Sequence, residues 1–204
     1  ISKKFNKETD KEKREMNIID NLLPNNIFGK LAGTIMQHDG YRCLDYTVYP
    51  NESDGSISCY GENNPNLNTK KHEVLFTTDI FNSTHNAQII HDIYYHLSEE
   101  FDELYRCLNV QKMLLMRANC TVATTLNYRS SFHIDLKKSA YQGIGKTAIL
   151  YLNTNNGGTQ IKDGIFVDSI ANSVVVFNNL TEHAGVWATD KKLRFVLNLN
   201  YLEN

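Results

Sequence analysis

The spacing of apolar residues changes near the middle of the chain, and the N-terminal half shows a helical spacing. Over about residues 24–37, Ile27, Leu31 and Ile35 recur every four positions, which predicts an amphipathic helix. A second helix is predicted over about residues 84–107, where apolar residues form one stripe. The stripe consists of Ile89, Ile90, Ile93, Leu97, Phe101, Leu104, Tyr105 and Leu108. A stripe of this kind is typical of packing against a hydrophobic core.

The rest of the N-terminal half is predicted as short extended segments and loops. Residues 1–16 are rich in Lys, Glu, Asp and Asn and are expected to form a polar leader. An apolar strand or turn is expected over residues 18–24, and bulky, β-prone residues predict strands over 41–49 and 73–81. Between these strands, residues 50–72 form a polar loop with Gly, Pro, Asn and Ser, which is typical of a lid or binding loop.

From Gln111 onward, short apolar or alternating runs follow one another, separated by Asn, Gly, Asp and Ser. The runs cover residues 111–118, 121–127, 131–137, 146–153, 159–162, 173–178, 183–187 and 192–202. Short strands at regular spacing predict a β-sandwich or barrel. We therefore expect a mainly β fold with N-terminal helices (α+β), built as one domain over residues 1–204. After the polar leader it comprises a helix-rich support region over 17–110 and a β-rich core over 111–204.

Composition narrows the class of protein. With 41% hydrophobic and 22% charged residues among 204, the chain is an ordinary globular protein without a membrane-spanning run. The formal net charge of −2 gives no support for nucleic-acid binding, although it does not exclude it. The four cysteines form no CxxC pair, so reduced thiols and a cytoplasmic location are expected. Since the sequence begins at Ile1, a preceding segment with a targeting signal is left open.

A histidine and an aspartate two positions apart are the first candidates for chemistry. In the run from Phe132 to Leu136, His133 and Asp135 share one face if the segment is a strand, because side chains alternate. A carboxylate among apolar neighbours is costly to bury without a cation or metal. His183, which follows another apolar strand, can supply a third ligand. Two histidines and one carboxylate form the facial triad of non-haem Fe(II) oxygenases, which leaves coordination positions open.

The remaining histidines are predicted to be solvated or packing residues, because they lie in the helical or loop-rich N-terminal half. They are His38, His72, His85, His91 and His96. A lone His-x-Asp motif is a weak signal. The interpretation of a metal site therefore depends on His183 and on a basic residue further along the chain.

That basic residue is Arg194, in the last strand-like segment. One face of this segment carries Leu193, Phe195, Leu197, Leu199 and Tyr201, and the other carries Arg194, Val196, Asn198 and Asn200. An arginine on an inward polar face needs an anion, and its planar guanidinium matches a carboxylate in bidentate fashion. An outward-facing arginine on a solvated sheet edge is the alternative.

Together these features resemble the 2-oxoglutarate/Fe(II)-dependent dioxygenase superfamily. The His-x-Asp motif, the distant histidine and the basic residue about ten positions later are typical of it, and the resemblance covers roughly residues 110–204. Within the superfamily the chain is most similar to the prolyl-4-hydroxylase-like branch and its phage-encoded, viral members. Residues 148–154, followed by Gly157 and Gly158, resemble the family's "YLN…GG" strand–turn–strand, and residues 19–24 resemble its opening segment.

The resemblance implies a double-stranded β-helix, or jelly roll, supported by helices. It also implies a hydroxylase that uses Fe(II), O2 and 2-oxoglutarate, forms succinate and CO2, and takes ascorbate as reductant. His133, Asp135 and His183 would bind iron, and Arg194 would bind the C5 carboxylate of 2-oxoglutarate, where many collagen-type prolyl hydroxylases have lysine. Tyr151 matches a tyrosine that hydrogen-bonds the same carboxylate. The presence of Asp135 implies hydroxylation, because halogenases of the family lack this ligand.

The substrate that the resemblance implies is a protein or peptide of the prolyl type, whereas a small molecule or a nucleobase is left open. Two other functions also stay open, a cupin-like jelly roll that binds a metal or ligand without redox chemistry, and a non-catalytic oxygenase fold. Trp187 is expected at the pocket mouth or in the core. Arg117 and Asn119 share one face of their strand and are expected either in the pocket or at a sheet edge. The oligomeric state is not predicted.

Overall fold

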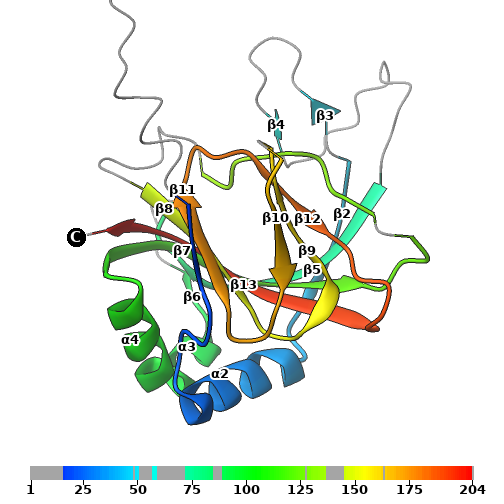
Figure 1. Cartoon of the computed structure of the whole chain (residues 1–204). Helices are drawn as coiled ribbons and strands as arrows, with labels where there is room; N and C mark the ends of the chain where they lie inside the picture. The colour runs from blue at the N-terminus through cyan, green and yellow to red at the C-terminus, as the bar shows by residue number, and fades with distance from the viewer. Residues whose placement is uncertain are drawn as a thin grey trace, which may run out of the picture.

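Two antiparallel sheets form most of the protein (Figure 1). The computed structural model describes residues 16–47, 49–50, 57–58, 72–84, 89–126, 128–136, 145–162 and 164–203. The strands of the larger sheet are β1 (Met16–Ile19), β2 (Arg42–Thr47), β5 (His72–Asn82), β6 (Ile89–Ile90), β7 (Val110–Val122), β8 (Gly145–Tyr151), β11 (Val174–Asn178) and β13 (Leu193–Glu203). They are arranged in the order β1-β11-β8-β13-β7-β5-β2, and β6 pairs with β5.

The smaller sheet has the order β10-β9-β12. Its strands are β9 (Asn155–Ile161), β10 (Phe166–Ser169) and β12 (His183–Val186), and a separate pair is formed by β3 (Tyr49–Pro50) and β4 (Ile57–Ser58). Both sheets are purely antiparallel. The mainly β architecture predicted for the C-terminal half is therefore confirmed, and β1, β2 and β5 from the N-terminal half extend the same sheet.

The helices lie together on one side of the sheets (Figure 1). They are α2 (Asn25–Gln37), α3 (Asp92–His96) and α4 (Ser98–Cys107). None of the helices in the described ranges is long and apolar enough to cross a bilayer. As predicted, α2 begins directly after Pro24, and its buried residues include Leu31 and Ile35.

Alternation along β13 separates two hydrophobic cores, because successive side chains of a strand point to opposite faces. Leu197 and Leu199 pack with the helices in the larger core, together with Leu31 and Phe101. Val196 belongs to a second core with residues of the smaller sheet. The second face of β13 is thus turned toward the smaller sheet, and this is the face that carries Arg194 and Asn198.

The second predicted helix, over residues 84–107, is wrong in its first part. Residues 89–90 form β6, which pairs with Phe81 and Asn82 of β5, and residues 85–88 lie outside the described part of the chain. The helix begins only at Asp92, where the His91 side chain accepts a hydrogen bond from the backbone N–H of Ile93. Helical spacing alone cannot detect this, because an isoleucine pair fits a buried strand equally well.

Several strand predictions also need correction. Residues 131–136 form no strand, since their only ladder contact among the described residues is an isolated bridge between His133 and His183. The predicted strands 111–118 and 121–127 are one strand as far as Val122, and β10 was not predicted. The polar leader, except Met16, and most of the 50–72 loop lie outside the described residues.

Two adjacent glycines allow the smaller sheet to pack tightly. A Cβ atom at Gly157 would lie 2.5 Å from the carbonyl oxygen of Val186, and one at Gly158 would lie 2.3 Å from that of Val167. Any side chain at either position would therefore force the strands apart. This close packing accounts for the Gly-Gly pair after the 148–154 segment, and the Gly158 carbonyl accepts a hydrogen bond from Arg194, which lines the pocket.

Candidate metal centre and its pocket

Backbone pairing brings the two histidines together. His133 and His183 form an isolated antiparallel bridge, in which each backbone N–H donates to the other residue's carbonyl at 2.9 and 3.0 Å. Directly opposed residues of an antiparallel pair place their side chains on the same face. The two imidazole rings accordingly lie with centroids 4.7 Å apart. Phe177 packs against the His183 ring at 4.9 Å between centroids.

Asp135 completes a three-residue cluster with the two histidines. Its Oδ1 lies 3.6 Å from His133 Nε2 and its Oδ2 lies 3.7 Å from His183 Nε2. One ligand atom from each residue falls within 4.8 Å of the other two, the spread expected of atoms that share one metal ion. The cluster that the sequence predicted is therefore brought together, although its His-x-Asp part lies in a loop with one bridge rather than in a strand.

Hydrogen bonds orient both imidazoles toward the cluster. His133 Nδ1 lies 3.1 Å from the carbonyl oxygen of Ser131, and His183 Nδ1 lies 3.1 Å from that of Thr181. A carbonyl can only accept, so in the neutral imidazole Nδ1 carries the proton and Nε2 presents its lone pair. Both rings thus offer Nε2 to a metal in the way that ligating histidines are commonly held.

The protonation states also suit a metal ion. Burial alone raises the pKa of Asp135, but the imidazoles of His183 and His133 outweigh it, so the carboxyl pKa lies well below its usual range. Burial lowers the pKa of the His183 imidazole, whose side chain is only 3% exposed. A carboxylate and a neutral imidazole are the forms that bind metals. The donor set of two imidazole nitrogens and one carboxylate fits Fe(II) with open positions.

Two amides of β13 hold the carboxylate of Asp135. Asn198 Nδ2 donates to Asp135 Oδ2 at 3.0 Å, and Asn200 Nδ2 lies 3.5 Å from the same oxygen. Asn200 is itself held through its Oδ1, which accepts from the hydroxyl of Thr147 at 3.0 Å. The strand that carries Arg194 therefore also orients the carboxylate ligand. The sequence placed both asparagines on the Arg194 face but assigned them no role.

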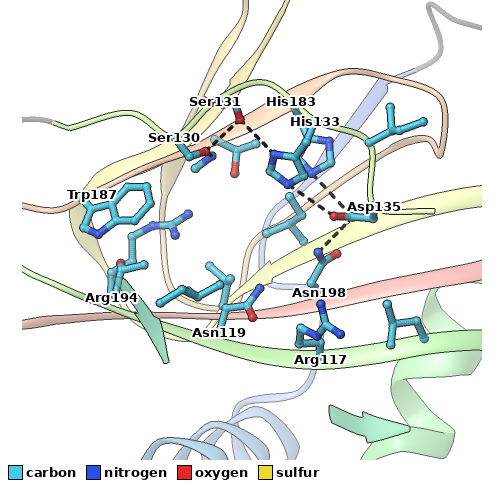
Figure 2. Close-up of a pocket in the computed structure, with 18 residues that line it drawn as sticks. Arg117, Asn119, Ser130, Ser131, His133, Asp135, His183, Trp187, Arg194 and Asn198 are labelled. Atoms are coloured by element: carbon cyan, nitrogen blue, oxygen red, sulfur yellow. Dashed lines mark hydrogen bonds and ion pairs between the residues drawn. The ribbon is translucent and has the colours of Figure 1, made fainter. Parts of the chain in front are cut away.

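A pocket between the two sheets contains this cluster and the predicted arginine (Figure 2). The residues that line it are Leu75, Leu115, Arg117, Asn119, Thr121, Ser130, Ser131, His133, Ile134, Asp135, Ile149, Thr159, His183, Gly185, Trp187, Arg194, Val196 and Asn198. Figure 2 shows Arg194 beside Trp187 on one side of the pocket and the His–Asp cluster on the other. Trp187, 8% exposed, lines the pocket and stacks edge-on against Tyr128.

Arg194 is a buried cation. Its residue is 5% exposed, one terminal nitrogen donates to the Gly158 carbonyl at 2.9 Å, and its Nε has no hydrogen-bond partner among the described residues. No carboxylate in the described part of the chain forms an ion pair with it. Burial lowers its pKa to about 10, so it remains charged at neutral pH. An unpaired buried charge is costly, and an anionic ligand would remove that cost.

The structure places Tyr151 behind the pocket wall. It is fully buried, and its hydroxyl donates to Thr159 Oγ1 at 2.8 Å. Arg194 lies with its guanidinium carbon 5.8 Å from the Tyr151 ring centroid. Thr159 itself lines the pocket, as does Thr121, which is paired with Arg194 in the strand register. The buried hydroxyl of Thr121 has no partner within the described ranges. These two threonines could not be identified from the sequence, because threonines are common in strands.

No protein-family model matches the chain, and no curated protein matches its sequence. Solved structures do match. An oxidoreductase of the 2OG-Fe(II) oxygenase family from Burkholderia pseudomallei superimposes with a TM-score of 0.59 and 7% identity, over 93% of this chain and 86% of that one. The non-heme alpha-ketoglutarate-dependent epimerase SnoN from nogalamycin biosynthesis gives 0.58 and 9%, over 94% of this chain and 79% of that one.

A third match is a prolyl hydroxylase from Trichoplax adhaerens, in complex with a hypoxia inducible factor oxygen degradation domain peptide fragment. It superimposes with a TM-score of 0.56 and 15% identity, over 98% of this chain and 94% of that one. At such low identities the likeness establishes the fold. The chain has the helix-supported jelly-roll fold of the 2-oxoglutarate/Fe(II) oxygenases, which confirms the fold class predicted from the sequence.

Proposed function

We propose that the protein is an Fe(II)- and 2-oxoglutarate-dependent oxygenase that hydroxylates an unactivated C–H bond. One observation carries the proposal, namely that the His133–Asp135–His183 cluster and the unpaired cation of Arg194 line the same pocket. A metal-binding jelly roll without redox chemistry would not require a buried arginine beside the metal ligands. The metal-binding cluster and Arg194 together match a co-substrate that has a metal-binding 2-oxo acid at one end and a carboxylate at the other.

In this proposal His133, Asp135 and His183 hold the metal, and Arg194 binds the C5 carboxylate of 2-oxoglutarate. Iron, 2-oxoglutarate and O2 supply the oxidising chemistry, and 2-oxoglutarate leaves as succinate and CO2. The protein's own residues bind and orient. The Ser131 and Thr181 carbonyls set the imidazole tautomers, and Trp187 helps to close the carboxylate end of the pocket from water.

The proposed substrate is a peptide or protein side chain of the prolyl type. The sequence resemblance favours it, and one structural neighbour holds a peptide. Another neighbour is an epimerase from the biosynthesis of nogalamycin. The fold therefore serves more than one class of substrate, and the peptide assignment depends on the resemblance rather than on the fold.

Succinate formation tests the reaction class directly. The purified protein is incubated with Fe(II), 2-oxoglutarate, O2 and ascorbate, and succinate is measured with and without a metal chelator. We expect succinate to form slowly even when no primary substrate is present. The chelator should abolish this succinate formation. If no succinate forms and calorimetry detects no binding of 2-oxoglutarate to the metal-loaded protein, the proposed function is wrong.

Replacing Thr159 by valine is expected to raise the KM for 2-oxoglutarate by about tenfold or more, the effect of one hydrogen bond to a charged group. Since Tyr151 donates to Thr159 Oγ1, the threonine's own hydrogen can point at the carboxylate. Tyr151→Phe should therefore raise KM less than Thr159→Val, and Thr159→Ser should remain near wild type. A larger effect of Tyr151→Phe would instead indicate that the tyrosine contacts the carboxylate itself. Initial rates of succinate formation give all three values.

A further inference from the structure

The pocket contains a second guanidinium, that of Arg117, on the side away from Arg194. Arg117 lies on β7, opposite Asn198 of β13 in the antiparallel register. On its other side it is opposite Asp79 of β5, and its Nε donates to Asp79 Oδ1 at 2.5 Å. Figure 2 shows Arg117 below Asn198 and Asp135, whereas Arg194 and Trp187 lie across the pocket.

Arg117 is separated from the place where the co-substrate is expected. Arg194 and Asn198 are four residues apart on β13, which corresponds to roughly 13 Å along the strand. If 2-oxoglutarate binds as proposed, one end is held by Arg194 and the other by the metal. Both ends of that molecule are then occupied, so Arg117 faces a different molecule on the far side of the metal.

The pocket wall near Arg117 combines this guanidinium with aliphatic surface. Leu115, two residues before Arg117 on β7, and Ile134, next to Asp135, line the pocket together with Arg117 and Asn198. The Arg117–Asp79 pair is partly exposed, with side-chain exposures of 27% and 29%, and such pairs add little to stability. Asp79 is not among the residues that line the pocket, and it holds the guanidinium from the neighbouring strand β5. This arrangement suits recognition rather than folding.

We propose that Arg117, positioned by Asp79, binds an uncharged carbonyl oxygen of the primary substrate, close to the aliphatic carbon that is oxidised. This deepens the proposed function and rests on it. The amide of a peptide and the amide or ester of a small molecule share this chemistry. Arg117 is thereby a specificity-determining residue, distinct from the anion-binding Arg194.

A count of charges favours an uncharged group over a carboxylate. In the loaded pocket, the charges of Fe(II) and Arg194 balance those of Asp135 and doubly charged 2-oxoglutarate. Arg117 is already paired with Asp79. A substrate carboxylate would add an uncompensated negative charge beside Asp79 and Asp135, which is unfavourable at low dielectric. A neutral carbonyl accepts hydrogen bonds from the guanidinium without that repulsion.

The experiment compares matched probes on the full chain. One arm contains the N-methylamides and methyl esters of cyclopentanecarboxylic acid and of short branched aliphatic acids, and a second contains the free acids. A third arm contains end-blocked peptides with a central proline, leucine or valine. Binding to the protein loaded with Zn(II) and 2-oxoglutarate is measured by calorimetry, and oxidation by the iron form is measured as the mass of one added oxygen.

The two arms without a free carboxylate, namely the amides and esters and the end-blocked peptides, are the neutral arms. We expect compounds of at least one neutral arm to bind at least tenfold more tightly than the free acids and to be oxidised. A response of the peptides alone identifies a peptide carbonyl, and a response of the small amides or esters identifies a small-molecule substrate. Preference for the acids overturns the proposal. So does the absence of oxidation in both neutral arms when succinate forms normally, a result that leaves the proposed function intact.

Variants then assign the effect to Arg117. Arg117→Met should raise the KM for the preferred neutral probe about tenfold or more and change the KM for 2-oxoglutarate less than twofold, whereas Arg117→Lys should retain part of the binding. Asp79→Asn should shift preference toward the acids, because it removes the compensating charge. Arg106→Met, an exposed arginine on α4, is the matched control. If folded Arg117→Met and Arg117→Lys both bind the probe like wild type, the pair is merely structural and the proposal is wrong.

Discussion

A variant with Asp135 replaced by alanine is expected to bind Fe(II) at least about 100-fold more weakly than wild type and to form no succinate above background. Asp135 is the one anionic member of the cluster, and its ionised form is favoured by His183 and His133. Losing only a hydrogen-bond partner of a metal ligand typically costs about 10–100-fold in metal affinity. Losing the ligand itself should cost more.

Anaerobic titration with Fe(II), monitored by calorimetry, measures the loss of iron affinity without any turnover. Asp102→Asn, on the exposed side of α4, is the control for a general loss of negative charge and should bind iron like wild type. Circular dichroism shows whether the Asp135→Ala variant is folded. Wild-type iron affinity in a folded Asp135→Ala variant would mean that the metal ion binds elsewhere.

The three predicted metal ligands lie together, even though the local structure predicted around them was wrong, and metal binding itself stays a prediction. His133 and Asp135 were expected to share a face because of a strand, but the loop satisfies the same requirement through a single bridge to His183. Sequence alternation can place two residues on one face. It cannot show which distant residue will pair with them, because that pairing depends on the return of the chain through β12.

Strand alternation worked best at β13, where every second residue from Phe195 to Tyr201 packs in the larger core, although Leu193 on the same face is exposed. Leu197 and Leu199 pack in the larger core, whereas Arg194 and Asn198 line the pocket, as the pattern predicted. The pattern could not reveal that Asn198 holds Asp135, since this contact spans 63 residues.

Tyr151 shows a further limit of the sequence. The motif placed it near the carboxylate, and the structure places it within 5.8 Å of the Arg194 guanidinium. Its hydroxyl is nevertheless bonded to Thr159, from the next strand, which reaches the pocket instead. Side-chain length and strand curvature decide which of two neighbouring hydroxyls is exposed to a ligand, and neither can be read from a linear motif. Whether Tyr151 contacts 2-oxoglutarate stays a prediction.

Replacing Arg194 by methionine is expected to have two opposite effects, a loss of 2-oxoglutarate binding of about 100-fold or more and a free protein that is no less stable than wild type. The affinity falls because a charge-assisted, bidentate contact with the carboxylate is lost. Stability is maintained because the variant no longer buries a cation that no carboxylate in the described part of the chain neutralises and whose Nε has no partner there. Replacing a whole buried ion pair by apolar residues of similar volume is often neutral or stabilises by about 1–4 kcal/mol, and a lone buried cation is at least as costly to keep as such a pair.

Thermal unfolding of the Zn(II)-loaded protein separates these two effects. At 2-oxoglutarate concentrations about 100 times the dissociation constant, the ligand should stabilise wild type by about 2.7 kcal/mol, and the same concentration should shift Arg194→Met far less. Arg106→Met, in which an exposed arginine is removed from its pair with Glu103, should retain the full ligand-induced shift. An Arg194→Met variant that unfolds at a much lower temperature without ligand would indicate that the arginine holds the sheets together. In that case the unpaired guanidinium would no longer be an argument for an anionic co-substrate, and only the metal cluster would support the oxygenase assignment.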